Sequence, residues 1–195
     1  MLESKLIGLK QLEKTLKTTG VKDEKALSTA IKVEGFRLMR LLKKQIVAGA
    51  PGGQKFAPLT FLSRAFGGAG RMRPNKPLRR LAVAVRYHVP KQSPIEMHVG
   101  WTGPRTSKSW KRIAEMQQEG FESGITDKRR RYFLFKAAAM PKRSAARKYL
   151  FLKPGTTRFK TPGRPIMEPF WRSEKDRAWR NIRNNYRLKL KGERI

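Results

Sequence analysis

The chain has 195 residues, with 46 Lys and Arg against 14 Asp and Glu and a formal net charge of +32. Such a charge opposes the compact state of an isolated protein, so we expect a negatively charged partner, which can be nucleic acid, an acidic protein surface or anionic lipid. The absence of cysteine excludes disulfides, thiolate zinc sites and a cysteine nucleophile, and no apolar run reaches the roughly 18 residues of a membrane-spanning helix.

Residues 1–50 are predicted to form helices. Apolar residues recur at helical spacing within residues 6–20, and a second, longer helix begins near Asp23, which is a suitable N-cap. Gly35 lies near the middle of that helix, where it is about 1 kcal/mol less favourable than Ala, so we expect close packing against another backbone there. The apolar stripe of the long helix consists of Leu27, Ile31, Leu38, Leu42 and Ile46.

Residues 51–80 are predicted to form a basic loop. Gly and Pro residues end the long helix, Phe56 and Leu59 serve as apolar anchors, and residues 61–66 suit a short helix. The rest of the loop is rich in Gly, Pro and basic residues, which is typical of a long functional loop. The candidate partner contacts in it are Arg71, Arg73, Lys76, Arg79 and Arg80.

The sheet is predicted within residues 81–152. Residues 81–89 are rich in β-formers, and residues 95–101 alternate apolar and polar, with Glu96 and His98 expected to face outward. These two strands are expected to pair as an antiparallel hairpin. Residues 132–135 and 149–152 are candidates for further strands.

A helix near residues 110–119 is predicted to end at Gly120, which tolerates the left-handed conformation after a helix. Ile113, Met116 and Gln117 would share one helix face. We expect Ile113 and Met116, with Phe170 and Trp171 later in the chain, to hold the fold together. The run after Gly120 predicts a charged loop with four candidate contacts, namely Lys128, Arg129, Arg130 and Arg131.

Residues 153–195 are predicted to form a basic arm and a C-terminal helix. The segment 128–195 carries 22 Lys and Arg against 4 Asp and Glu, about +18, which is more than half of the net charge. Pro169 suits the first turn of the helix. One face would carry Trp171, Ala178, Trp179, Ile182 and Tyr186, and the others would carry the candidate contacts Arg172, Arg177, Arg180, Arg183 and Arg187.

Together these elements predict one α+β domain spanning 1–195. An antiparallel sheet would pack against the long N-terminal helix, with a C-terminal helix and long basic loops.

No motif argues for catalysis, a cofactor or a metal. Residues 49–55 do not form a phosphate-binding loop, because Lys55 follows Gln54 rather than Gly and Phe56 replaces the Ser or Thr that binds the metal. His88 and His98 would approach each other in the hairpin, but two histidines without a third ligand make a poor metal site. No pair of carboxyl residues stands out as a general acid and base, so we expect no enzyme.

Three short motifs, in order, resemble the tail-completion (virion-morphogenesis) proteins of tailed bacteriophages, a family that overlaps with neck and minor tail proteins. They are Gly-Ala-Pro-Gly-Gly-Gln-Lys-Phe-Ala-Pro-Leu-Thr ending at Thr60, Ile-Ala-Glu-Met-Gln-Gln-Glu-Gly ending at Gly120, and Arg-Pro-Ile-Met-Glu-Pro-Phe ending at Phe170. Phe56 stands where the family often has Trp, and Gln117 where it often has His, with an extra residue before the Gly.

The resemblance implies a non-enzymatic virion protein at the head-proximal end of the tail. Its implied partners are the tail terminator, the head connector and the DNA of the neck channel, within a homo-oligomeric ring assembled in the host cytoplasm and without membrane contact. Independently of the resemblance, the basic C-terminal helix with its aromatic residues is compatible with a nucleic-acid-binding protein of the packaging or ribosomal type. A hydrolase with an unrecognised site is a third reading, which requires a converging set of titratable groups.

Overall fold

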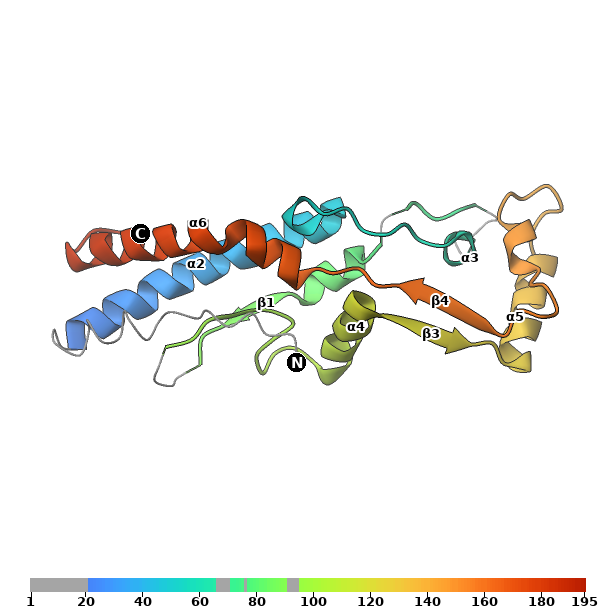
Figure 1. Ribbon diagram of the computed structural model, residues 1–195, viewed down its shortest axis with the longest axis horizontal. Coiled ribbons are helices and arrows are strands. Elements are labelled where there is room, and N and C mark those ends of the chain that lie inside the picture. Colours follow the sequence, from blue (N-terminus) through green and yellow to red (C-terminus); the bar gives the residue numbers. More distant parts are fainter. Residues whose placement is uncertain (1–20, 66–70, 76, 91–94) are drawn as a thin grey trace. The chain divides into compact units, whose positions relative to one another are not determined.

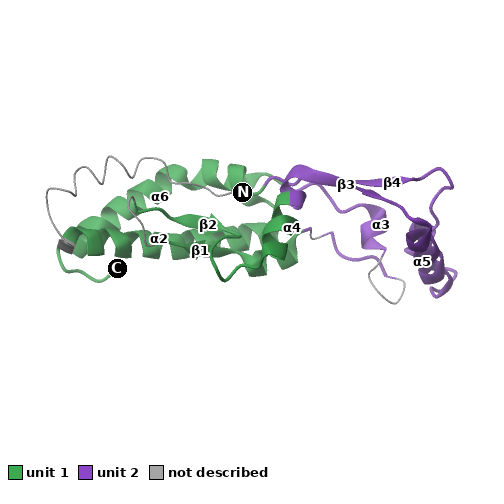
Figure 2. Ribbon diagram, turned by 90° about the horizontal axis from the view of Figure 1, so that it is seen from below, with its two compact units in different colours: residues 1–55, 78–115, 166–195 green, residues 56–77, 116–165 purple. Residues whose placement is uncertain are grey.

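The computed structural model describes residues 21–65, 71–75, 77–90 and 95–195, and the fold is α+β (Figure 1). The chain forms two compact units (Figure 2): unit 1 comprises residues 1–55, 78–115 and 166–195, and unit 2 comprises residues 56–77 and 116–165. The single domain over 1–195 stays a prediction. The predicted helix within residues 6–20 lies outside the described residues. Among the helices of the described ranges, none is both long and apolar enough to cross a bilayer.

Unit 1 is built on two long helices, α2 (Val21–Ala48) and α6 (Met167–Leu190), which pack side by side (Figure 1). The long N-terminal helix is confirmed, and all five residues of its predicted stripe are at most 2% exposed. In α6 the buried face consists of Met167, Phe170, Glu174, Ala178 and Ile182. The predicted face was partly wrong, because Trp171, Trp179 and Tyr186 are only half-buried.

Gly35 is a close-packing position, as predicted, but the contact is with side chains rather than with another backbone. A Cβ at Gly35 would lie 2.7 Å from Met97 Sδ and 2.8 Å from Tyr87 Cδ2. The missing side chain therefore lets the β-hairpin of unit 1 approach α2 directly.

The β-hairpin pairs β1 (Arg86–His88) with β2 (His98–Gly100) in antiparallel register, and His88 lies opposite His98. The antiparallel hairpin is confirmed, but the strand predicted from residue 81 is wrong at its start. Residues 79–84 form a 3₁₀ helix, η2 (Arg79–Ala84), which follows Leu78 at φ 64°. Val83 is 69% exposed although Leu81 and Val85 are buried, because a 3₁₀ helix does not alternate its side chains as a strand does.

The helix predicted near residues 110–119 is α4 (Lys108–Glu119), and Gly120 follows it at φ 83°, as expected. The predicted apolar face is wrong. Ile113 is 44% exposed and Ala114 is the buried residue of this helix. Of the four residues expected to hold the fold together, Phe170 is buried, Met116 and Trp171 are half-buried, and Ile113 is exposed.

In unit 2, β3 (Gly120–Gly124) pairs with β4 (Arg158–Pro162) in an antiparallel ribbon. The backbone at the start of β3 approaches the backbone just after β4 closely. A Cβ on Gly120 would lie 2.6 Å from the Gly163 nitrogen, so glycine is required there.

The rest of unit 2 is helical where strands were predicted. Residues 132–135 belong to α5 (Asp127–Ala138), and residues 149–152 overlap the 3₁₀ helix η3 (Arg147–Leu150). The short helix α3 (Phe61–Arg64) completes the unit, close to its predicted place. The core of unit 2 is small, and consists of Ala65, Phe133, Ala137, Ala146 and Leu150.

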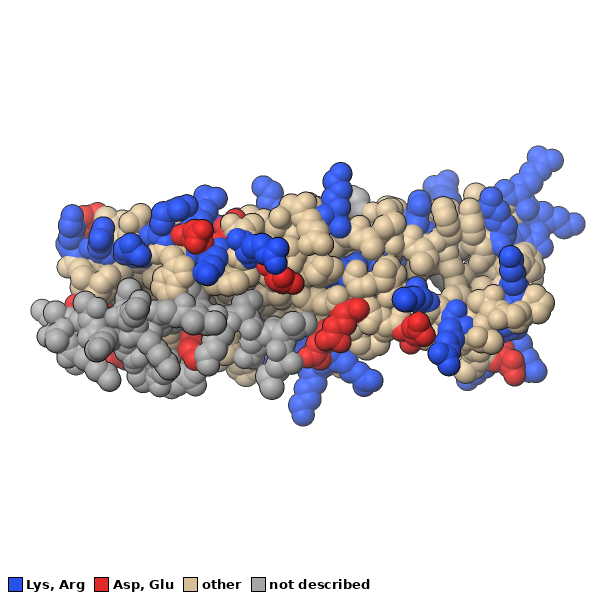
Figure 3. All heavy atoms as spheres, viewed as in Figure 1, with Lys and Arg blue, Asp and Glu red and all other residues tan. Residues whose placement is uncertain are grey.

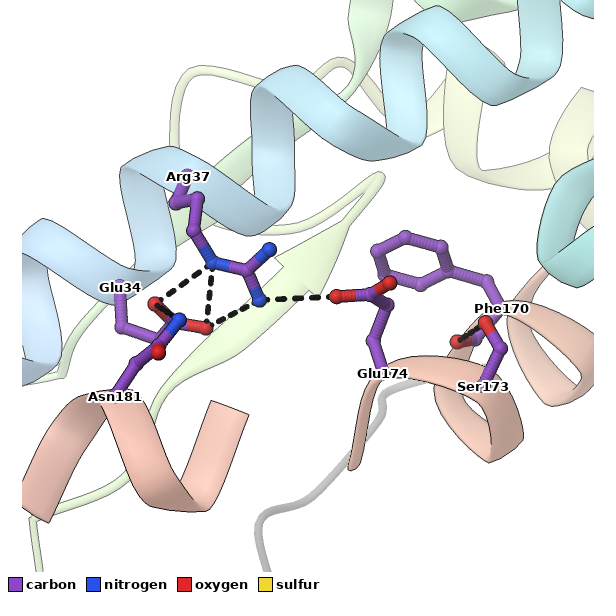
Figure 4. Close-up of polar contacts among 6 residues, drawn as sticks. All are labelled: Glu34, Arg37, Phe170, Ser173, Glu174 and Asn181. Carbon is purple, nitrogen blue, oxygen red and sulfur yellow. Dashed lines mark hydrogen bonds and ion pairs between the residues drawn. The ribbon is translucent and has the colours of Figure 1, made fainter. Parts of the chain in front are cut away.

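A buried polar cluster joins α2 to α6 in unit 1 (Figure 4). Glu34 is 1% exposed and accepts hydrogen bonds from Arg37 and, at 3.1 Å, from Asn181 Nδ2. Arg37 also donates to Glu174 Oε2 at 3.0 Å. These two carboxylates raise the pKa of Arg37, chiefly through the hydrogen bond to Glu34. Two buried carboxylates thus share one guanidinium, which ties the two helices together at a fixed register.

Candidate binding surface

Arg164 lies at the point where the three motifs of the family resemblance meet. Its Nε donates to the Ala57 carbonyl at 2.8 Å, and its NH2 group donates to the Pro58 carbonyl at 3.0 Å. Its NH1 group donates to Gln117 Oε1 at 3.3 Å, and its backbone nitrogen donates to the Gln117 carbonyl at 2.8 Å. All these residues belong to unit 2.

The Arg164 side chain is 2% exposed, and burial lowers the pKa of its guanidinium. Its guanidinium donates to neutral carbonyl and amide oxygens, so its role is to satisfy backbone groups of the 57–58 loop inside the fold. Arg164 is therefore a structural residue, although charge alone would place it with the surface arginines.

The positive charge is denser in unit 2 than in unit 1. Unit 2 carries 17 Lys and Arg against 3 Asp and Glu, a net +14 in 72 residues. Unit 1 carries 29 against 11, a net +18 in 123 residues. Between Asp127 and Glu168 the sequence has 13 basic residues and no acidic one. Figure 3 shows Lys and Arg side chains gathered at the end of the view that holds α5.

The basic run 128–131 is helical and not a loop, which corrects the prediction for this segment. Thr126 caps the helix by accepting a hydrogen bond from the Arg129 nitrogen at 3.3 Å. The four side chains then have different roles. Arg130 is half-buried and donates to the carbonyls of Lys153, Pro154 and Thr156, and Arg129 donates to Ser123 Oγ and to the Gly124 carbonyl. Lys128 and Arg131 are exposed.

Exposed aromatic side chains accompany these cations in unit 2. Phe61, Tyr132, Phe135 and Phe151 are between 49% and 68% exposed. Several of the rings lie next to a cation: Lys136 Nζ is 5.6 Å from the Tyr132 ring centroid, Lys148 Nζ is 5.1 Å from that of Tyr149, and Arg147 Cζ is 5.7 Å from that of Phe151. Phe61 and Tyr149 stack in parallel with their centroids 4.9 Å apart. Sequence inspection missed this surface because residues 132–135 and 149–152 were assigned to strands, and Phe61 to a short helix with no binding role.

The other predicted contact residues are dispersed. Arg71 and Arg73 are exposed in unit 2, Arg79 and Arg80 are exposed on η2 in unit 1, and Lys76 lies outside the described residues. The arginines of α6 are exposed, as predicted, and Arg172 pairs with Glu168 at 2.6 Å on the helix surface. The predicted set is thus divided between the two units: Arg71, Arg73 and Lys128–Arg131 in unit 2, and the remaining described members in unit 1.

His88 and His98 lie opposite each other in the hairpin. His98 Nε2 lies 3.1 Å from Glu96 Oε2, and Glu96 is buried, which corrects its predicted outward position. Across the part of the chain that the structure describes, no three His, Cys, Asp or Glu side chains are placed to hold a metal ion. A cavity of about 430 Å³ in unit 1 is lined by residues including Lys32, Arg86 and Arg105.

Comparison with protein-family models, with curated proteins and with solved structures finds no match to this chain. The arrangement of its residues is therefore the basis for assigning a function.

Proposed function

We propose that this protein is a structural component of a phage particle that joins the head to the tail, at the head-proximal end of the tail, as one subunit of a ring. The observation that carries the proposal is the set of hydrogen bonds made by Arg164. The resemblance rests on three motifs, and residues from each of them, Ala57 and Pro58, Gln117, and Arg164, are bonded together in unit 2. The three motifs thus contact one another in the fold, which supports treating them as one pattern.

Charge provides the second support. A subunit with a net charge of +32 repels its own copies, so a ring of such subunits requires negative charge from DNA or from acidic neighbouring proteins. Exposed cations on α5 and α6 are available for these contacts, whereas Arg129 and Arg130 are engaged within unit 2. The proposed role is docking and not catalysis. The partners are the tail terminator, the head connector and DNA in the neck channel.

Deleting the gene from the phage or prophage that encodes this chain tests the proposal. Electron microscopy of the lysate is expected to show filled heads and separate tails, and a plasmid copy is expected to restore joined particles. A lysate with joined, infectious particles in the absence of the protein would contradict the proposal.

A variant of the plasmid copy then tests the docking residues. Lys128→Ala/Arg131→Ala is expected to lower the yield of joined particles without lowering the melting temperature, because both side chains are exposed. Arg40→Ala/Lys44→Ala removes two exposed cations from α2 in unit 1 and serves as the matched control. Equal losses of yield in the two variants would contradict a specific role for the α5 cations.

A further inference from the structure

The outward face of α5 has an unusual composition. Lys128, Arg131, Tyr132 and Phe135 are spaced i, i+3, i+4 and i+7, so they form one stripe along the helix. Phe133 and Ala137, at 6% and 0% exposure, are directed into the core of unit 2 instead. Tyr132 and Phe135 remain 49% and 68% exposed. Surface helices usually carry polar residues on this face, so two large rings there require an explanation.

Charge limits what can cover the stripe. It lies in a unit with a net charge of +14, at the start of the segment without acidic residues that runs to Glu168. A second copy placed face to face would bring two such units together and would be repelled. The occupant is therefore an anion.

The exposed aromatic rings favour a nucleic acid over an acidic protein as the occupant of the stripe. Lys136 Nζ lies over the Tyr132 ring, 5.6 Å from its centroid, so a cation lies against one face of this ring. This combination suits a nucleotide, whose base stacks on the ring while its phosphate pairs with the cation. An acidic peptide would use the cations but has no flat group that requires an exposed ring. In a duplex the bases are stacked on one another, so the rings favour unpaired bases.

We propose that the stripe of Lys128, Arg131, Tyr132 and Phe135, together with Lys136, binds single-stranded nucleic acid. Tyr132 and Phe135 stack on bases, and the three cations neutralise phosphates. This activity uses Lys128 and Arg131, which the head–tail proposal also assigns to docking, but nucleic-acid binding can be measured separately, with the purified chain.

The test is fluorescence anisotropy with the full-length protein and three labelled probes: a 20-nucleotide oligothymidine, a duplex of equal length, and a polyglutamate peptide of matched charge. The oligothymidine is expected to bind most tightly. Tyr132→Ala/Phe135→Ala is expected to weaken its binding about 30-fold, since each stacked base contributes at least about 1 kcal/mol. The slope of log affinity against log salt should not change in this variant.

Lys128→Ala/Arg131→Ala should instead reduce that salt slope by about 1.4, because each phosphate contact of a single strand contributes about 0.7. Phe36→Ala is the matched control for the rings. Phe36 is 47% exposed on α2 in unit 1, with Arg40 Cζ 5.7 Å from its ring centroid. This variant should bind oligothymidine within about twofold of the unaltered protein.

Tyr132 also lies near the core, with its ring centroid 6.2 Å from that of Phe133. The single variant Phe135→Ala therefore provides a second binding measurement without disturbing the fold. Its affinity for oligothymidine is expected to fall about fivefold. Unchanged oligothymidine binding in Phe135→Ala, or a loss no larger than in Phe36→Ala, would overturn the proposal. Equal or tighter binding of polyglutamate would overturn it in favour of an acidic protein partner, and equal or tighter binding of the duplex would overturn the assignment to single strands.

Discussion

Arg37 of α2 and Glu174 of α6 form an ion pair at 3.0 Å, although 137 residues separate them in the sequence. The pair continues to Glu34 and Asn181, so both long helices contribute to one buried polar cluster (Figure 4). Its partners specify how α2 and α6 align, because sliding one helix along the other would separate Glu34 from Asn181 and Glu174 from Arg37.

Replacing Arg37 is expected to destabilise unit 1 strongly. Arg37→Ala leaves Glu34 and Glu174 buried without their shared cation, and the expected loss is about 3 kcal/mol in the free energy of unfolding. All four tryptophans belong to unit 1, so denaturant unfolding followed by tryptophan fluorescence measures this unit. Arg40→Ala, an exposed arginine one turn later, should change the value by less than about 0.5 kcal/mol. Equal effects of the two substitutions would show that the buried cluster is unimportant for stability.

Replacing Arg164 is expected to loosen unit 2. Arg164→Ala removes the donors of the Ala57 and Pro58 carbonyls and of the Gln117 side chain, with an expected loss of about 3 kcal/mol. Unit 2 contains no tryptophan, so hydrogen–deuterium exchange of β3 and β4 is the suitable measurement. Both strands should exchange faster in the variant.

Arg158→Ala is the control for Arg164, because its side chain is 74% exposed and lies 3.6 Å from Glu122 at the surface. Exchange in β3 and β4 should remain close to that of the unaltered protein. Unchanged exchange in Arg164→Ala would remove the support that this residue gives to the family resemblance.

Two neighbouring glycines after α2 should respond differently to the same substitution. Both have positive φ, 59° at Gly52 and 83° at Gly53. A Cβ on Gly52 would lie 2.0 Å from the Pro169 carbonyl oxygen, whereas nothing lies within 4 Å of a Cβ on Gly53. Gly53→Ala should lower the free energy of unfolding by about 1 kcal/mol, because alanine disfavours a positive φ.

Gly52→Ala should lower the free energy of unfolding by about 2 kcal/mol more than Gly53→Ala does, because the backbone at the start of α6 must move to admit the methyl group. Tryptophan-monitored unfolding of both variants measures the difference. Similar losses would mean that η1 (Pro51–Gly53) does not pack closely on α6 in solution.

Alkaline pH should destabilise unit 1 through Tyr186. Burial, and secondarily the charge of Asp23, raises the pKa of Tyr186 above its ordinary value of 10.0. The folded state then holds the phenolic proton more tightly than the unfolded state. The resulting contribution of Tyr186 to the free energy of unfolding is fully present below the pKa that Tyr186 has in the unfolded state. It is lost as the pH rises above about 10.

Tyr186→Phe removes the ionisable group, so its stability should fall less between pH 9 and pH 11 than that of the unaltered protein. Thermal melts of both proteins at each pH measure this difference. If both proteins lose the same stability over this pH range, ionisable groups other than Tyr186 cause the loss.

The sequence predicted the long helices because their apolar residues recur over many turns. The stripe of Leu27, Ile31, Leu38, Leu42 and Ile46 leaves little choice of structure or of buried face. Short apolar runs were ambiguous. Residues 132–135 have the composition of a strand, and four residues are too few to show a period. Thr126 and Asp127 were the helix-start signal that could have identified α5.

The buried charges were harder to foresee. Glu34 lies between Ile31 and Leu38 on the buried side of α2, and Glu174 lies between Phe170 and Ala178 on that of α6. Their spacing places them inside, but their charge predicts exposure. The cation that pairs with Glu174 is 137 residues away, and the donor that reaches Glu34 from the facing helix is 147 residues away. Likewise, nothing in the local sequence separates the engaged Arg129 and Arg130 from the exposed Lys128 and Arg131. Those roles depend on tertiary contacts with β3 and with the residues before β4.

Quantitative mass spectrometry of phage particles purified from the virus or strain that carries this gene tests the head–tail proposal most directly. The proposal predicts the protein at a small, fixed copy number per particle, retained after washing in high salt and treatment with nuclease. Its absence from particles, with recovery of the protein on cellular nucleic acid instead, would contradict a structural role in the virion.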